Sequence, residues 1–182
     1  MKIGLTKRVA LQNGFQYDTI DQRWYDILSG QTLFFIPNTL QQDLNLIANE
    51  LDSVILTGEN SSIVNKEIEL QLIQKMSDRG KPVLGIANSA FTVAESIGGT
   101  IEPISNQNGL SHPIFYNREV IEVSSYHDYC IKTLPENVDS LCLDYLGNVE
   151  AFISNNRCGV VWNPEKMEKP WIPPEIAYLL RI

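Results

Sequence analysis

Short apolar runs alternate with longer amphipathic segments along the first hundred residues, and this alternation limits the chain to few folds. Four apolar runs are predicted strands: Lys2–Thr6, Gln31–Ile36, Asp52–Thr57 and Pro82–Ile86. Four segments with apolar residues at helical spacing are predicted helices: Asp21–Leu28, Leu40–Leu51, Asn65–Arg79 and Ala87–Ile97. Apolar strands that alternate with helices are typical of a parallel sheet buried on both faces, so we predict an α/β fold.

The pattern changes after the glycine pair Gly98-Gly99. Residues Glu102–Asn117 include two prolines and a glycine, and we expect them to form a loop. Four short strand-like pieces follow: Val120–Ser125, Val138–Asp144, Val149–Ile153 and Gly159–Trp162. A short helix is expected near Glu175–Leu180. We interpret this last third as an antiparallel section of a single domain that spans residues 1–182.

Length, charge and cysteine content exclude several classes of function. A chain of 182 residues has the size of one domain. Its net charge of −8 has the wrong sign for binding nucleic acid or an anionic membrane surface. No apolar stretch approaches the roughly 20 residues that a membrane span needs. Three cysteines without CxxC spacing favour neither a disulfide framework nor a zinc site. We therefore expect a cytoplasmic protein that carries no cofactor.

Two strand ends in the first half carry residues suited to a functional site, because active sites of doubly wound sheets lie at the carboxyl ends of strands. Gly58 and Glu59 form a glycine turn after the second buried strand. Further on, the chain passes from the strand Pro82–Ile86 directly into a helix at Ala87 and Asn88. This transition is either an ordinary strand–helix turn or a nucleophile elbow, in which one side chain lies beside the backbone N–H groups of a helix N-terminus.

Two later strand ends also carry polar residues. Ser125 and His127 flank Tyr126 and share a face, and the histidine is either a hydrogen-bonded structural residue or part of a site. The segment Trp162–Glu165 ends the last strand with an amide, a proline and a carboxylate, a pattern that also fits an ordinary turn. His112 and His127 are the only histidines, and neither has a neighbour at metal-ligand spacing, so we expect no metal site.

The order and spacing of these pieces resemble the class I glutamine amidotransferase family, in its peptidase C26-like branch of γ-glutamyl hydrolases and γ-glutamyl-γ-aminobutyrate hydrolases. That family has a glycine-rich strand end, a G-[IV]-C-R-G-x-Q elbow, a Ser-x-His element and a W-H-P-E motif. The matching segments here are Thr57–Asn60 (TGEN), Gly85–Phe91 (GIANSAF), Ser125–His127 (SYH) and Trp162–Glu165 (WNPE). The resemblance implies a flavodoxin-like three-layer sandwich with a mostly parallel central sheet and a C-terminal antiparallel section.

Working members of that family use a Cys–His–Glu triad, and two of its three positions differ here. The nucleophile position is Ala87, and a methyl group cannot attack a carbonyl. The base position is Asn163, whose amide cannot take a proton near neutral pH. Only Glu165 matches, as the carboxylate that orients the histidine in the family. The resemblance therefore implies that the family's glutaminase chemistry is absent.

The same resemblance assigns roles to further positions. Gly58, Glu59 and Asn88 belong to the oxyanion turn and the elbow. Four side chains are assigned to ligand binding: Phe91, Ser125, Tyr126 and His127. Phe91 replaces the motif's glutamine, and Glu59 puts a carboxylate where a developing oxyanion would be repelled. Because several positions of one site differ together, we favour natural loss of the amidase chemistry over an engineered inactivation.

We therefore predict a degenerate class I glutamine amidotransferase-like protein, a pseudoenzyme that acts as a ligand-binding or regulatory protein. Its expected partners are a small γ-glutamyl or amide ligand and a protein partner enzyme. One alternative is a γ-glutamyl amide hydrolase or amidotransferase of altered mechanism in surface-polysaccharide biosynthesis, with Glu165 as general base toward water. The other alternative is an engineered, inactive form of the family's hydrolase.

Overall fold

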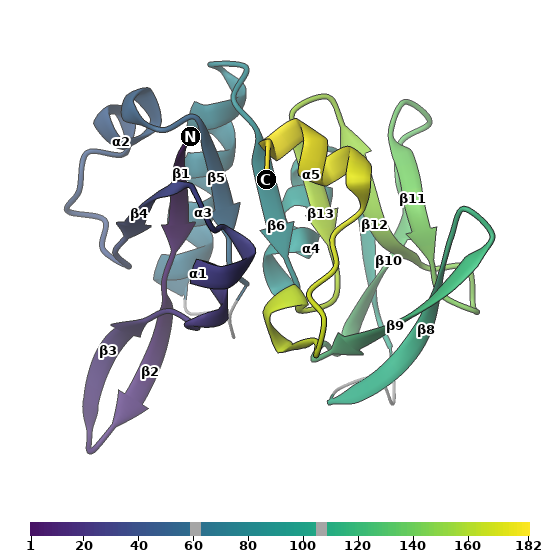
Figure 1. Ribbon diagram of the computed structural model, residues 1–182. Coiled ribbons are helices and arrows are strands. Elements are labelled where there is room, and N and C mark those ends of the chain that lie inside the picture. Colours follow the sequence, from purple (N-terminus) through teal and green to yellow (C-terminus); the bar gives the residue numbers. More distant parts are fainter. Residues whose placement is uncertain (59–62, 105–108) are drawn as a thin grey trace.

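A computed structural model describes residues 1–58, 63–104 and 109–182, which form a large twisted sheet with helices on both faces and a separate two-stranded hairpin (Figure 1). The parallel half of the sheet follows the order β4-β1-β5-β6-β13. These strands are β1 (Lys2–Thr6), β4 (Thr32–Ile36), β5 (Ser53–Leu56), β6 (Val83–Ile86) and β13 (Arg157–Val160). The predicted α/β fold with a parallel core is confirmed.

An antiparallel section continues the sheet from β13. The order there is β13-β12-β11-β8-β9, and β10 pairs with β12 and with β7. The strands are β7 (Thr100–Pro103), β8 (Leu110–Tyr116), β9 (Glu119–Ser125), β10 (Tyr129–Thr133), β11 (Asp139–Leu143) and β12 (Val149–Ser154). The predicted C-terminal antiparallel section is therefore present, and it belongs to the same sheet as the parallel strands.

Helices cover the two faces of the sheet as separate layers. On one face lie α2 (Leu44–Glu50), α3 (Ile63–Ser77) and α4 (Asn88–Ser96), and their apolar side chains pack with Val54, Leu56 and Val83. On the other face lie α1 (Arg23–Ile27) and α5 (Pro174–Leu180), which pack with Ile55, Leu84 and Val160. Successive apolar residues of β5 and β6 thus enter opposite cores, and the three-layer sandwich is confirmed.

The helix α2 shows how a local residue sets an element boundary. The apolar spacing predicts a helix from Leu40, but the Asp43 side chain accepts hydrogen bonds from the backbone N–H groups of Asn45 and Leu46, at 2.9 and 3.0 Å. An N-cap of this kind satisfies N–H groups that have no partner within the helix. The helix therefore begins after Asp43, at Leu44.

Two expectations about the strands are wrong. The run Gln31–Ile36 was expected to be buried on both faces, but β4 lies at the sheet edge, and Phe34 and Phe35 are 40% and 36% exposed. The segment Glu102–Asn117 is not a loop throughout, because its end forms β8, and Thr100–Pro103 forms β7. Pro113 is tolerated in β8 because β8 lies near the edge of the sheet. It pairs regularly with β9, but with β11 it shares only the pair of Phe115 and Leu143.

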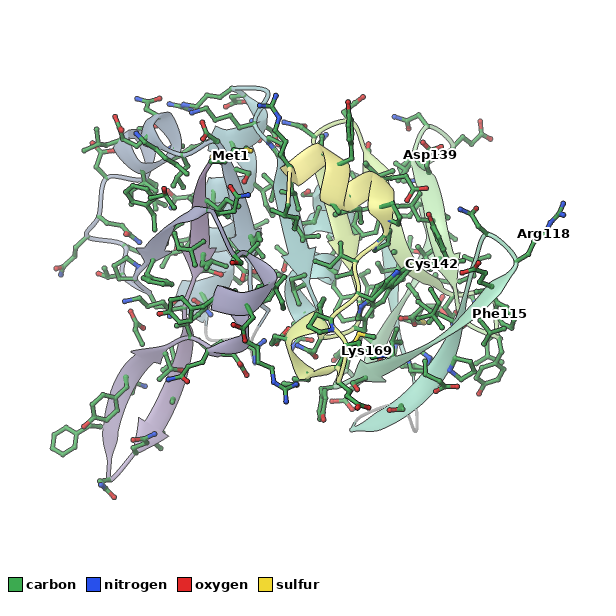
Figure 2. The ribbon with its side chains drawn as sticks, in the orientation of Figure 1. Met1, Phe115, Arg118, Asp139, Cys142 and Lys169 are labelled. Carbon is green, nitrogen blue, oxygen red and sulfur yellow. The ribbon has the colours of Figure 1, made fainter. Side chains whose placement is uncertain are left out.

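Besides β7 and β8, three further strands have no counterpart among the predicted elements. One is β10, and the others are β2 (Arg8–Gln12) and β3 (Phe15–Thr19), an antiparallel hairpin that projects away from the sandwich (Figure 1). A similar hairpin joins β8 to β9, with φ of 45° and 70° at Asn117 and Arg118, and Figure 2 shows Arg118 pointing away from the protein. Two consecutive positive φ angles are the geometry of a type I′ turn.

Within the residues that the structure describes, no helix combines the length and apolar composition needed to cross a membrane.

Candidate functional site

The connection between β6 and α4 is a single strained residue. The strand ends at Ile86 and the helix begins at Asn88, which leaves Ala87 with φ of 50° and ψ of −118°. Residues other than glycine adopt such angles only where the surrounding structure enforces them. The Ala87 N–H donates to the carbonyl oxygen of Val160 at 2.9 Å, which ties the turn to β13. This is the geometry of a nucleophile elbow, and the side chain at its apex is a methyl group.

The glycine turn after β5 packs directly on this elbow. Gly58 has a φ of 54°, and a Cβ at this position would overlap the carbonyl oxygen of Ile86 and lie 3.1 Å from the backbone nitrogen of Asn88. Only glycine allows so close an approach of two backbones. The structure therefore brings Gly58 and Asn88 together as the sequence suggested, whereas Glu59 lies outside the described residues.

Glu165 is held by a partner that the sequence did not indicate. Glu165 is fully buried, and its Oε1 accepts a hydrogen bond from the Asn163 side-chain amide at 2.9 Å and forms an ion pair with Arg8. The Arg8 guanidinium also donates to the Thr57 carbonyl oxygen from Nε and Nη2, at 3.2 and 2.8 Å. Arg8 thus joins the start of β2, the glycine turn and the short 3-10 helix Pro164–Lys166 (η1).

Sequence reasoning missed Arg8 because it did not predict the β2–β3 hairpin. Its place in the chain could have indicated a role in the site, because Arg8 follows the end of β1 by two residues. It therefore lies at the carboxyl ends of the parallel strands, as the other site residues do. The Arg8 contact also limits what Glu165 can do. One carboxylate oxygen is engaged by two donors and the other is buried, so the carboxylate is not exposed to the neighbouring pocket as a general base toward water would be.

A cavity of about 590 Å³ lies beside the elbow. Among the described residues, seven of the predicted site residues line it: Gly58, Ala87, Asn88, Phe91, Tyr126, His127 and Asn163. Glu165 and Ser125 are not among its lining residues. Further lining side chains carry charge and were not found from the sequence: Arg8, Lys66, Glu69, Glu95, Asp128 and Lys166. The wall therefore offers both cationic and anionic groups to a ligand.

A family model for class I glutamine amidotransferases matches residues 20–173, which is most of the chain. The chain belongs to the class I glutamine amidotransferase family. A γ-glutamyl-CDP-amidate hydrolase of Campylobacter jejuni is 26% identical over 183 residues, covering 91% of this chain and 90% of that protein.

Solved structures of amidotransferases share the fold. A Thermoplasma acidophilum protein named for a GMP synthase subunit has a TM-score of 0.73 at 18% identity, over 99% of this chain and 92% of that chain. A glutamine amidotransferase of Thermotoga maritima has a TM-score of 0.72 at 16% identity, over 90% of this chain and 76% of that chain. This likeness agrees with the sheet order and helix layers described above.

In this amidotransferase fold, one part of the cavity wall is aromatic. The Phe91 ring meets the His127 ring edge to face, with centroids 5.8 Å apart, and meets Tyr129 in the same way at 6.4 Å. Burial lowers the pKa of His127 to about 4, assisted by the neighbouring His112, against the opposing effect of a hydrogen bond to the Tyr129 carbonyl. His127 is therefore neutral at physiological pH and lends the wall no positive charge.

The side chains of Ser125 and Tyr126 lie in different environments although the two residues are neighbours in sequence. The ring of Tyr126 lines the cavity, and the Lys166 ammonium lies 3.9 Å from its centroid, a cation–π contact. Ser125 is fully buried, and its hydroxyl lies 2.7 Å from Nε2 of His112. The structure thus assigns Tyr126 to the pocket and Ser125 to a cluster behind it.

A buried carboxyl group, Glu69 of α3, also lines the cavity. Burial raises the pKa of Glu69 to about 7, although a hydrogen bond from Ser89 and the charge of Lys66 act in the opposite direction. The Ser89 hydroxyl donates to Oε1 of Glu69 over 2.5 Å. Ser89 is the residue two positions past the elbow, so the elbow helix and α3 are joined at this point.

Glu69 should make stability depend on pH. Its pKa rises from an ordinary 4.5 to about 7 on folding, so the folded state keeps a proton that the unfolded state loses. The stabilisation is complete below about pH 4.5 and is lost as the pH rises through 7, about 3 kcal/mol in all. We expect Glu69→Gln to remove this loss in urea unfolding at pH 5 and pH 8. Glu67→Gln, an exposed site on the same helix, is the control, and equal pH dependence in both variants would contradict the assignment.

Proposed function

We propose that this protein binds a small γ-glutamyl or related amide ligand in the cavity beside Ala87 and does not hydrolyse it by cysteine chemistry. The observation that carries the proposal is the elbow. Its backbone strain and its tight contact with Gly58 are those of a catalytic turn, yet the side chain at its apex is a methyl group. A site that keeps the binding geometry without the nucleophile is suited to recognition rather than acyl transfer.

The size and charge of the cavity support a ligand of this class. Its volume of about 590 Å³ lies within the range of roughly 300–1,000 Å³ that is usual for small-molecule sites. A γ-glutamyl group carries an α-ammonium and an α-carboxylate, so it needs partners of both signs. Lys166 and Asp128 place charges of opposite sign at the wall, and Lys66 and Glu95 add an ion pair there, with Nζ and Oε2 3.1 Å apart. The substrate in the name of the Campylobacter jejuni relative, a γ-glutamyl-CDP-amidate, is accordingly one of the probes.

The test is binding without turnover. Isothermal titration of purified protein with L-glutamine, γ-glutamyl amides and γ-glutamyl-CDP-amidate should give one binding site for at least one probe. Lys166→Met should weaken that binding about tenfold or more, because a charged hydrogen-bond donor is lost. The matched control is Lys169→Met, three residues along the chain and outside the cavity lining, which should leave the affinity unchanged.

Release of glutamate or ammonia should stay at the level of a protein-free blank for every probe. The single changes Ala87→Cys and Asn163→His should not raise it, because nucleophile and base act as a unit. The alternative function is amide hydrolysis by another mechanism, and the hydrolase name of the Campylobacter jejuni relative favours it. Turnover of a γ-glutamyl probe by the unaltered protein would replace the binding proposal with that alternative. Absence of binding to all probes would exclude both.

A further inference from the structure

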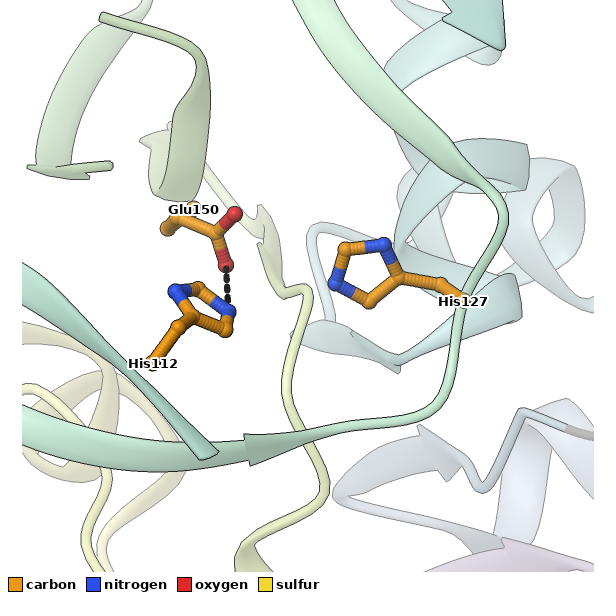
Figure 3. Close-up of side chains that lie close together, drawn as sticks. All are labelled: His112, His127 and Glu150. Atoms are coloured by element: carbon orange, nitrogen blue, oxygen red, sulfur yellow. Dashed lines mark ion pairs between the residues drawn. The ribbon is translucent and has the colours of Figure 1, made fainter. Parts of the chain in front are cut away.

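Behind the aromatic wall, three side chains from separate elements meet in the interior (Figure 3). They are His112 of β8, His127 of the segment between β9 and β10, and Glu150 of β12. One nitrogen or oxygen atom from each lies within 4.8 Å of the other two, and all three side chains are buried. No local sequence pattern indicates this cluster, because the residues are 15 to 38 positions apart and are joined only by strand pairing.

The hydrogen bonds of the two histidines leave one nitrogen of each ring directed into this cluster. His127 Nδ1 lies 2.8 Å from the Tyr129 carbonyl oxygen, which can only accept, so Nδ1 carries the proton and Nε2 carries a lone pair. His112 Nδ1 lies 3.4 Å from the Pro113 carbonyl oxygen, and its Nε2 faces the Ser125 hydroxyl and Glu150. Metal-binding histidines commonly have this arrangement, with the second ring nitrogen held by a carbonyl oxygen.

The third member, Glu150, is buried without adequate compensation. It is 1% exposed, and within the described chain neither of its carboxylate oxygens has a hydrogen-bond partner. Nε2 of His127 likewise has none. The nearest cationic candidate is His112, with Nε2 at 4.0 Å from Oε2 of Glu150. Burial, with the nearby charge of Asp144, raises the pKa of Glu150 to about 8. An unpaired buried carboxylate is costly, so this cluster calls for a cation or a retained proton.

We propose that His112, His127 and Glu150 bind one divalent first-row transition-metal ion, of which Zn²⁺ is the first to test. Two imidazoles and one carboxylate are a ligand set suited to such ions. Zinc with bonds of about 2.0–2.1 Å holds tetrahedral ligand atoms about 3.3 Å apart, so each side chain moves inward by less than one bond length. The ion would take the lone pairs of both Nε2 atoms and the charge of Glu150, and the Ser125 hydroxyl would lose its present acceptor.

The metal-site proposal does not depend on the ligand proposal, although His127 contributes to both sites. The histidine's ring packs on Phe91 at the cavity wall and directs Nε2 away into the cluster. The metal site stands whether or not the cavity binds a γ-glutamyl compound, and its test uses no amide ligand.

The experiment measures metal binding by tag-free protein. After dialysis against EDTA and removal of the chelator, the protein is mixed with Zn²⁺, gel-filtered and assayed by inductively coupled plasma mass spectrometry. We expect one zinc per chain and a higher melting temperature. Co²⁺ should give the visible ligand-field bands of a low-coordinate nitrogen and oxygen site. Strong thiolate-to-metal charge-transfer bands would instead assign the ion to one of the cysteines and overturn the proposal.

Variants test the ligands one at a time. Glu150→Gln and His127→Gln should each weaken zinc binding at least tenfold. Glu122→Gln, an exposed glutamate of β9, should leave it unchanged. The melting transition of each variant in EDTA shows whether the variant folds. Zinc retention by the unaltered protein tests the proposal without any variant. If that protein retains no zinc after gel filtration, or if Glu150→Gln binds it equally well, the proposal fails and Glu150 is a carboxyl group kept neutral by its proton.

Discussion

Gly58→Ala is expected to destabilise the protein by about 4 kcal/mol or more, a large part of the roughly 5–15 kcal/mol by which a domain of this kind is usually stable. The new methyl group would overlap the Ile86 carbonyl oxygen and lie 2.8 Å from the carbonyl carbon. Both atoms are backbone at the end of β6, so no side-chain rotation relieves the clash. The turn after β5 and the elbow would have to separate, which would also open the floor of the cavity. Urea unfolding at pH 7 measures the loss.

The matched control is Gly14→Ala at the tip of the β2–β3 hairpin. Gly14 has a φ of 81°, and nothing lies within 4 Å of a Cβ there, so alanine meets the conformational cost but no clash. That cost is about 1 kcal/mol. The difference between the two variants isolates the contact between the glycine turn and the elbow. Similar losses in both would mean that the turn and the elbow are not in the close contact described above.

The parallel half of the fold was predictable because each buried strand carries its own evidence. In β5 and β6 every residue is buried, and all except Ser53 are apolar or glycine, while the intervening α3 has an apolar stripe that includes Ile68, Leu72 and Met76. In the antiparallel half, β9, β11 and β12 were also predicted as strands, but β7, β8 and β10 lack such local evidence. β8 contains Pro113 and alternates exposed with buried residues, and its pairing with β9 depends on a turn at Asn117 and Arg118 whose residues are common in loops.

The candidate site divides along the same line. The elbow and the WNPE segment were found because each is a contiguous motif at a strand end. Arg8 and Lys66 were missed, because a lone basic residue on a hairpin or a helix has no recognisable local pattern. His112 and Glu150 were missed for a stronger reason. They meet only after β8, β11 and β12 pair, and the residue pattern of a single segment does not predict how these strands align with one another.

Arg8→Ala is expected to cost about 3 kcal/mol of stability, because it leaves the carboxylate of Glu165 buried without its cation. Glu165 is fully buried and Arg8 is 15% exposed in its side chain. In a Glu165→Gln background the same change should cost much less, since no buried charge remains, and urea unfolding of the four proteins at pH 7 gives the coupling energy directly.

The exposed pair of Lys2 and Glu50 provides the control for this cycle. Their side chains are 48% and 61% exposed, so Lys2→Ala should cost less than about 1 kcal/mol with or without Glu50. Equal costs of Arg8→Ala in both Glu165 backgrounds would contradict the role assigned to the ion pair. A large coupling would show that the buried carboxylate beside Asn163 has a structural role. Glu165 would then act as a structural clamp, joining η1 through Arg8 to the glycine turn that forms one side of the cavity.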